Sequence, residues 1–354
     1  MNRLEDQIKS KAGELGFDDC RITSAAAPES AEKLKAWLEA GRHGEMGYLE
    51  RNAHKRVDPQ LVLQGARSIV TLAASYSGFR REPKKAPDAS PAPAIARYAR
   101  FSDYHDVLGE RLKTLTAFLD DVAATEARSL WYVDTGPLLE RDLAQRAGIG
   151  FVGKHTNLIS RRLGNWIFLS EIITAADLAP DESETNHCGT CSRCIDACPT
   201  NAITGPFELD ARLCISYLTI ELKGSIPEEL RTAIGHRVYG CDDCLEACPW
   251  NRFAHEGRLM KEHARVDLDQ PKLLDLLGLD QPAFKSMFKG TPMLRTKRRG
   301  ILRNVCVALG NIGDASALPD LRRVVEDPEP LIAEHAAWAI ERIESRTFGA
   351  DRPP

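Results

Sequence analysis

The spacing of hydrophobic residues changes between helical and strand-like over the first 180 residues. Leu4, Ile8, Ala12 and Leu15 recur every three or four positions, which predicts an amphipathic helix near the start of the chain. Further helices are predicted over about 105–124 and 138–147, and short apolar runs predict strands at 17–22, 68–73, 129–133 and 165–169. Strands that alternate with helices indicate an α/β or α+β domain over residues 1–180.

Two later segments have patterns of their own. Residues 80–94 carry four prolines and several charges, which predicts an exposed, mobile loop. Residues 303–312 resemble residues 334–343 at an offset of 31, and prolines interrupt the chain between them. This spacing predicts a short HEAT-like α-repeat, with an ordinary helical tail as the alternative.

Composition narrows the class of protein. The chain has 354 residues, 43% of them hydrophobic and 28% charged, which is typical of a soluble globular protein of two or three domains. The net charge of −4 predicts no particular partner. No signal-peptide core and no run of about 18 apolar residues is found, so we expect a cytoplasmic, reducing environment. Closely spaced cysteines there are metal ligands more often than disulfides.

Eight of the ten cysteines lie between positions 188 and 248. They form two runs, each ending in Cys-Pro, with one isolated cysteine between the runs. This spacing is typical of bacterial two-cluster ferredoxins, in which the last cysteine of a run serves the other cluster. One [4Fe–4S] cluster then has the ligands Cys188, Cys191, Cys194 and Cys248, and the other has Cys198, Cys214, Cys241 and Cys244. Zinc is the weaker alternative, because zinc sites usually show two separated CxxC pairs.

The two remaining cysteines, Cys20 and Cys306, lie in apolar patterns and are expected to pack in the core.

Asp134 is the strongest catalytic candidate, since it follows a predicted strand and precedes a predicted helix. Ligands bind at that edge of an open α/β sheet, and a carboxyl group there can act as a general acid. The alternative is that Asp134 or Thr135 only caps the following helix.

Other polar motifs have simpler interpretations. Residues 103–109 resemble a D-x-H-x-x-G box that supplies an axial histidine to cobalamin, but the spacing is one residue too long, so a helix start is favoured. Arg56 alone predicts a surface charge, and residues 153–160 predict a turn. No glycine-rich dinucleotide fingerprint follows a strand, so nicotinamide or flavin binding has no support.

Residues 281–313 contain seven basic residues and no acidic ones. Such a patch is typical of binding to a phosphate backbone, with a solvated helix face as the alternative. The basic residues are Lys285, Lys289, Arg295, Lys297, Arg298, Arg299 and Arg303.

Several longer motifs coincide along the whole chain: YVDTGPLLERDLAQRAGIGFVGKHTNLI, CISYLTIELKG, GCDDCLEACPWN and the eight-cysteine module. With them the chain resembles the epoxyqueuosine reductases, cobalamin-dependent enzymes of tRNA queuosine synthesis. The resemblance implies an α+β multidomain protein. Its parts are an α/β-type cobalamin-binding catalytic domain at 1–180, a ferredoxin-like module with two [4Fe–4S] clusters at 181–260, and a HEAT-like, tRNA-binding tail at 261–354.

The resemblance also implies roles for individual residues. Asp134 is the general acid, and cobalamin is held base-off without an axial histidine. Contacts to the corrin are implied for Arg56, Tyr98, Asn157, Ser160, Ser216 and Asp242. Contacts to the tRNA anticodon stem-loop are implied for Lys297, Arg298, Arg299 and Arg303.

The activity implied is reduction of epoxyqueuosine at tRNA position 34 to queuosine by a monomer. An external low-potential donor supplies electrons through the two clusters to cobalamin. A reductive dehalogenase is the nearest alternative, but those enzymes usually carry a twin-Arg export signal and lack a basic helical tail. A ferredoxin-type electron carrier fused to a binding scaffold is the non-catalytic alternative.

Overall fold

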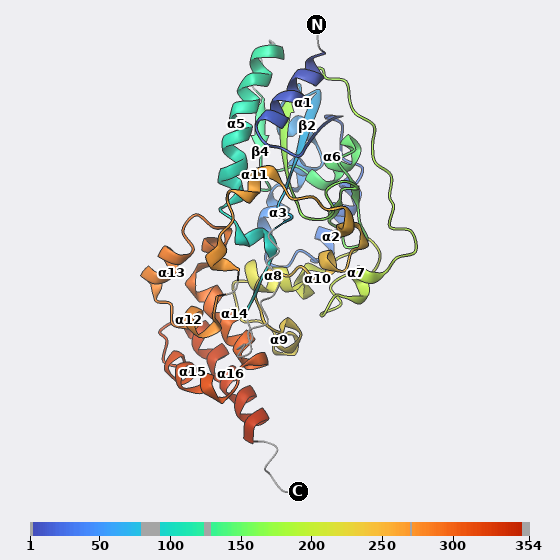
Figure 1. Ribbon diagram of the computed structural model, residues 1–354. Helices are drawn as coiled ribbons and strands as arrows, with labels where there is room; N and C mark the ends of the chain where they lie inside the picture. Colours follow the sequence, from blue (N-terminus) through green and yellow to red (C-terminus); the bar gives the residue numbers. More distant parts are fainter. Residues whose placement is uncertain (1–2, 79–92, 124–128, 270, 349–354) are drawn as a thin grey trace.

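The computed structural model describes residues 3–78, 93–123, 129–269 and 271–348 (Figure 1). The loop predicted at 80–94 falls almost entirely outside these residues. Among the described residues, no helix is both long enough and apolar enough to cross a membrane.

A four-stranded sheet forms the centre of the N-terminal part. Its strands follow the order β1 (Asp19–Ser24), β2 (Ser68–Ser75), β7 (Ile167–Thr174) and β4 (Leu130–Tyr132), and each neighbouring pair is antiparallel. The α+β alternative is therefore confirmed, whereas the α/β-type sheet expected for this domain is wrong. Alternation of strands and helices does not fix strand direction when the connections are long enough to return the chain either way.

Helices cover both faces of this sheet (Figure 1). On one face, α1 (Leu4–Glu14) and α5 (Tyr104–Ala123) share a core with Val70 and Leu72 of β2. On the other face, α6 (Glu140–Ala147) packs near Ile69 and Ala73. Because β2 is buried on both faces, its sequence is a nearly continuous apolar run.

Short elements connect the larger ones. Before β2 lie α2 (Ala31–Glu39), α3 (Gly47–Arg51) and α4 (Ala53–Arg56). A hairpin of β5 (Phe151–Val152) and β6 (Leu158–Ile159) follows α6. The short strand β3 (Ala94–Ile95) pairs in parallel with β8 (Arg237–Tyr239), which joins the N-terminal part to the cysteine-rich segment.

The cysteine-rich segment contains two similar helical turns, α7 (Arg193–Asp196) and α10 (Asp243–Glu246), which contact each other. The tail is helical, and the two segments that resemble each other lie in α14 (Lys297–Ile312) and α16 (Pro330–Phe348). These two helices pack extensively, with α15 (Leu318–Val324) against α16. Assignment of this packing to a HEAT-like repeat remains a prediction.

One hydrophobic core joins the tail to the segment between Cys214 and Cys241. Ile215 and Leu218 of α8 (Ile215–Ile220) belong to the same buried cluster as Ile301 and Val305 of α14. The proposed domain boundaries remain predictions, and this shared core crosses the one near residue 260. The remaining helices are α9 (Glu228–Ile234), α11 (Arg258–Lys261), α12 (Leu273–Leu277) and α13 (Gln281–Met287).

Candidate active site and cluster centre

The sequence predicts a first group of ligands, Cys188, Cys191, Cys194 and Cys248, and a second group, Cys198, Cys214, Cys241 and Cys244. In the second group, burial raises the pKa of Cys244, and the thiols of Cys214, Cys241 and Cys198 raise it further, as does Cys194 of the first group. In the first group, burial raises the pKa of Cys188, and the thiols of Cys248 and Cys191 act in the same direction. Members of each predicted group therefore lie near one another, and their assignment to individual clusters stays a prediction.

A cavity of about 90 Å³ lies at the centre of the first group. All four of its cysteines line this cavity, together with Trp250 and Pro249. Four soft thiolates around one apolar cavity are a donor set that suits an iron–sulfur cube. The partly buried Trp250 covers part of this site beside the ligands.

Cys20 and Cys306 are both buried and lie in the hydrophobic core. Their predicted role as core residues is confirmed.

Asp134 lies two residues beyond the edge strand β4, and its side chain is 61% exposed. The Tyr104 hydroxyl donates a hydrogen bond of 2.6 Å to Asp134 Oδ2. The backbone N–H of Asp134 donates to Glu140 Oε1 at 2.7 Å. Because α6 begins only at Glu140, the alternative that Asp134 caps this helix is wrong.

The backbone at Asp134 has a φ of 57°, in the left-handed region that few residues other than glycine adopt. Such a conformation costs about 1 kcal/mol or more and persists only where surrounding contacts hold it. The carboxyl group of Asp134 is exposed to solvent in this conformation, and the Tyr104 hydroxyl donates a hydrogen bond to one of its oxygens. The parallel-sheet argument for this position does not apply, since β4 pairs antiparallel with β7.

His105 is held between two carboxyl groups. Its Nδ1 lies 2.8 Å from Asp103 Oδ1, and its Nε2 lies 3.8 Å from Asp134 Oδ2. Asp103 is in turn paired with Arg295 at 2.6 Å. The ring therefore has a local partner in Asp103, and its position agrees with the predicted helix start.

Arg56 is not the surface charge that its local sequence suggests. Its side chain is buried, one terminal nitrogen donates to the Leu138 carbonyl at 3.1 Å, and Nε has no partner among the described residues. Tyr98 lies close to Tyr104 and Tyr239, with ring centroids 6.1 Å from each. Both residues therefore lie near Asp134, as their predicted role requires.

The other predicted corrin contacts are more dispersed. Asn157 lies in the β5–β6 turn, and this turn is tied to α6 by Arg141, which donates to the Thr156 carbonyl at 2.7 Å. Ser160 is 1% exposed and its hydroxyl accepts from two backbone N–H groups of its own turn. Asp242, next to a cluster cysteine, accepts the Arg97 N–H at 2.7 Å. Ser216 is partly buried in α8, two residues after Cys214.

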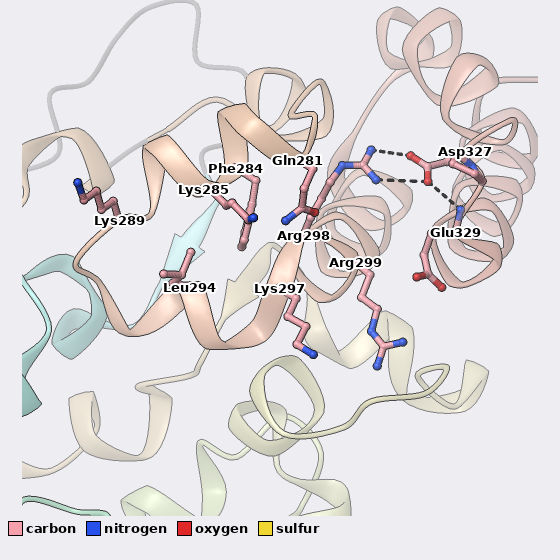
Figure 2. A pocket seen from close by; sticks show the side chains of 11 residues that line it. Gln281, Phe284, Lys285, Lys289, Leu294, Lys297, Arg298, Arg299, Asp327 and Glu329 are labelled. Carbon is pink, nitrogen blue, oxygen red and sulfur yellow. Dashed lines mark hydrogen bonds and ion pairs between the residues drawn. The ribbon is translucent and has the colours of Figure 1, made fainter.

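A basic pocket of about 880 Å³ lies at the junction of α13 and α14 (Figure 2). Lys285 and Lys289 line one side, and Lys297 and Arg299 extend from the first turn of α14. Arg298 faces Asp327 instead, at 2.5 Å, so a local ion pair offsets its charge. The pocket thus concentrates positive charge where the sequence predicted it.

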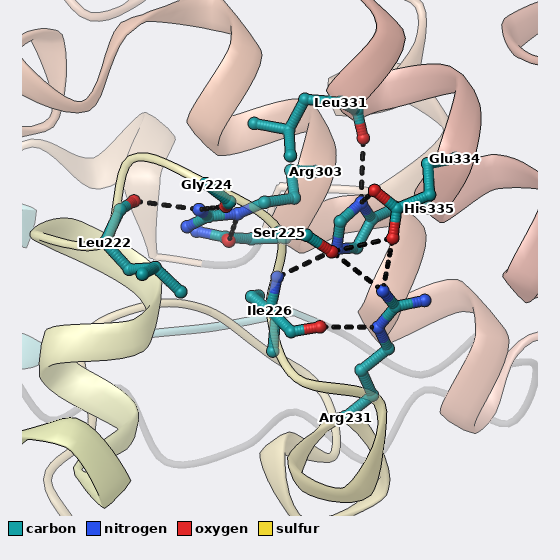
Figure 3. Close-up of polar contacts among 10 residues, drawn as sticks. Leu222, Gly224, Ser225, Ile226, Arg231, Arg303, Leu331, Glu334 and His335 are labelled. Carbon is teal, nitrogen blue, oxygen red and sulfur yellow. Dashed lines mark hydrogen bonds and ion pairs between the residues drawn. The ribbon is translucent and has the colours of Figure 1, made fainter.

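Arg303 does not belong to this surface. It has no exposed area, and its guanidinium donates to the carbonyls of Leu218, Leu222 and Gly224 at 2.7–2.8 Å (Figure 3). This burial contradicts the expectation that Arg303 contacts tRNA, because a group without exposed surface cannot reach a phosphate. The sequence shows the charge of Arg303 but not the carbonyl groups that accept its hydrogen bonds, which lie about 80 residues earlier in the chain.

Three residues around Asp134 were not singled out from the sequence. Tyr104 lies in the segment 103–109 but had no assigned role. Glu140 and Glu171 lie beneath the Asp134 loop, and their carboxyl groups lie beside each other. The sequence does contain a signal for Glu171, because it is the one charged residue in the apolar strand IFLSEIIT.

Two family models match the chain. The first is described as a 4Fe-4S double cluster binding domain and covers residues 187–251. The second is described as Epoxyqueuosine reductase QueG, DUF1730, and covers residues 56–135. With the cavity between the cysteines, the first match places the chain among proteins that carry two [4Fe–4S] clusters.

Relatives are similar over nearly the whole chain. An epoxyqueuosine reductase of Xanthomonas campestris is 40% identical, with 94% of each chain covered, and one of Escherichia coli is 38% identical, covering 98% of this chain and 91% of that one. The crystal structure of an epoxyqueuosine reductase with a modified tRNA-Tyr stem loop has a TM-score of 0.88 at 36% identity, covering 96% of this chain and 90% of that one. The chain therefore belongs to the epoxyqueuosine reductase family, whose members are oxidoreductases.

Proposed function

We propose that this protein reduces the epoxide of epoxyqueuosine in tRNA to the alkene of queuosine. The observation that carries the proposal is the arrangement of Asp134: an exposed carboxyl group, held by Tyr104, in a chain that also gathers ligands for two iron–sulfur clusters. Relatives of the same family, similar over nearly the full chain, support the choice of substrate.

The overall reaction needs two electrons and two protons. Both C–O bonds of the epoxide break, the oxygen leaves as water, and a carbon–carbon double bond remains. An external low-potential donor supplies the electrons, and the two clusters, when bound, provide a one-electron relay. Asp134 donates a proton to the oxygen as the first C–O bond breaks, so a neutral hydroxyl forms instead of a charged alkoxide, and a second proton from solvent lets that oxygen leave as water.

Tyr104 positions this acid. Its hydrogen bond occupies Oδ2, so that Oδ1, which accepts no hydrogen bond from the described residues, faces the substrate. The exposed position of Asp134 suits a substrate that arrives as part of a large RNA, since a splayed-out nucleotide can reach it from solvent.

Cobalamin is the further cofactor that we propose, and it would supply a cobalt nucleophile for the epoxide carbon. The buried Arg56 fits such a ligand, because its Nε–H has no acceptor among the described residues. Arg56, Tyr98, Asn157, Ser160, Ser216 and Asp242 would hold the corrin. His105 already lies between Asp103 and Asp134, so the residues present fit a base-off cofactor without an axial histidine.

The pocket at the α13–α14 junction would hold the RNA backbone. Lys297 and Arg299 lie beside Lys285 and Lys289, and none of these four is paired with an acid in the described structure. Arg298 contributes less because of its pairing with Asp327. Such a tRNA enzyme, acting as a monomer, fits the reducing cytoplasm, in which cysteines stay available as metal ligands.

The test is Asp134→Ala in protein reconstituted without oxygen, with Asp121→Ala on the exposed side of α5 as the matched control. Asp134→Ala should keep its iron content, the absorption spectrum of bound cobalamin and its affinity for the modified stem-loop, and lose turnover by about 10²–10⁴-fold. Near-normal turnover would exclude Asp134 as the acid. Absence of any cobalamin spectrum in the wild-type protein would favour the electron-carrier alternative.

A further inference from the structure

Two carboxyl groups form a pair directly beneath the Asp134 loop. Glu171 lies in β7, opposite Tyr132 of β4, and is completely buried. Glu140 is the first residue of α6, and its carboxyl group lies beside that of Glu171. No N–H or O–H donor among the described residues reaches either oxygen of Glu171.

A hydrogen bond between two carboxyl groups requires a proton on one of them. Two adjacent carboxylates in a buried site repel each other and cannot both be ionised at neutral pH. Burial and the Glu140 carboxyl raise the pKa of Glu171 well above its ordinary value, and burial and the Asp134 carboxylate raise the pKa of Glu140. The pair therefore retains a proton under conditions in which exposed glutamates have lost theirs.

The charged groups around the pair place the negative charge on Glu140. Arg56 and Arg141 interact favourably with Glu140, whereas the Asp134 carboxylate opposes ionisation of both members. Within the described part of the chain, the charged groups that act on Glu171 are the carboxyl groups of Glu140 and Asp134. Glu171 is accordingly the donor, and Glu140 is the acceptor that faces the loop.

Glu140 in turn holds the backbone of Asp134. Its Oε1 accepts the Asp134 N–H at 2.7 Å, in the residue whose φ of 57° is unfavourable without support. A carboxylate that lacked its bond from Glu171 could rotate toward Arg56 or Arg141 and release this N–H. The orientation of Glu140, and hence of the loop, depends on the proton held by Glu171.

We propose that Glu140 and Glu171 are positioning residues, a carboxyl pair sharing a proton that holds the Asp134 loop in its reactive conformation. The inference rests on the proposed role of Asp134 as the acid. The pair then causes the loss of activity at high pH. Once the shared proton is lost, the two carboxylates repel each other, Glu140 turns away from the Asp134 N–H and the loop is released.

Infrared spectroscopy tests the shared proton without any turnover. The wild-type protein at neutral pH should show the C=O stretch of a protonated carboxylic acid, which Glu171→Gln should remove and which Glu110→Gln, an exposed control on α5, should leave intact. A wild-type spectrum without this band, or a band that survives in Glu171→Gln, would overturn the proposal. Because this readout needs no substrate, it separates failure of the pair from failure of the proposed activity.

Turnover of the modified stem-loop then tests positioning. Glu171→Gln keeps an N–H donor toward Glu140, so kcat at neutral pH should stay within about twofold of wild type while the alkaline loss of activity moves to higher pH. Glu171→Leu removes the donor and should lower kcat roughly ten- to a hundredfold at unchanged KM. An unchanged alkaline limit in Glu171→Gln, or a normal kcat in Glu171→Leu, would contradict the role of the pair.

Discussion

The buried guanidinium of Arg303 gives the most direct test of how the tail is joined to the cluster segment. Arg303 lies in α14, and three of its N–H groups donate to carbonyls of the chain that follows Cys214 (Figure 3). Arg303→Met keeps most of the aliphatic stem and removes the guanidinium. We expect loss of stability in this region and little direct effect on RNA affinity.

The magnitude follows from two opposing contributions. Three hydrogen bonds from a charged donor are lost, one to a buried carbonyl and two to partly buried carbonyls, at about 2 kcal/mol each, or about 6 kcal/mol in all. Against this, burial lowers the pKa of Arg303 from 12.5 to about 10, so removing the buried charge recovers about 3 kcal/mol. The difference predicts a net destabilisation of about 3 kcal/mol, a large part of the stability of an ordinary domain.

The assay compares Arg303→Met with Arg299→Met, which changes a partly exposed residue of the same helix. Thermal unfolding of the reconstituted proteins should show a lower midpoint for Arg303→Met only, together with loss of the signal from the cluster that contains Cys214. Arg299→Met should unfold normally and bind the stem-loop more weakly. The reasoning is refuted if Arg303→Met unfolds like wild type but loses RNA affinity as Arg299→Met does.

Three further predictions follow from the site. Cys248→Ser should remove the cluster of the first run and leave the other, so iron content should fall by about half; loss of the signal from the other cluster would reject the exchanged ligation. Lys297→Gln with Arg299→Gln should weaken stem-loop binding and reduce the salt dependence of log K by about 0.7–0.9 per residue, whereas the exposed control Lys113→Gln should change neither. Because folding raises the pKa of both Glu140 and Glu171, the folded state holds a proton that the unfolded state loses, so stability should fall as pH rises above the ordinary range of a glutamate. Denaturant unfolding at several pH values should show this fall in wild type and a smaller one in Glu171→Gln.

Local periodicity was enough to predict most of the larger elements of the N-terminal part. The helix expected at 105–124 is observed as α5 at Tyr104–Ala123, and the strand expected at 68–73 is β2 at Ser68–Ser75. The direction of strands was not predictable in the same way. A buried antiparallel strand such as β2 has the same continuous apolar run as a parallel one, since both are covered on two faces.

The cysteines were predictable because ligand type and spacing carry the chemistry within a short stretch of sequence. The arginines were not, because their environment depends on distant residues. Arg56 is buried against Leu138, 82 positions away, and Arg303 is buried against carbonyls about 80 positions away. The same holds for Glu171, whose partner Glu140 is brought to it by the packing of α6 on the sheet.

The helix α14 combines two tasks that the sequence suggested were separate. Its first turn presents Lys297 and Arg299 to the basic pocket, and less than two turns later Arg303 binds the segment after Cys214. Neighbouring Asn304 adds hydrogen bonds to the carbonyls of Thr219 and Val238, so the same helix also holds β8. A helix so bonded cannot shift without moving the chain around the second group of cysteines. The surface proposed for RNA and that cysteine group therefore lie on one continuously packed unit, and changes at their junction should affect both together.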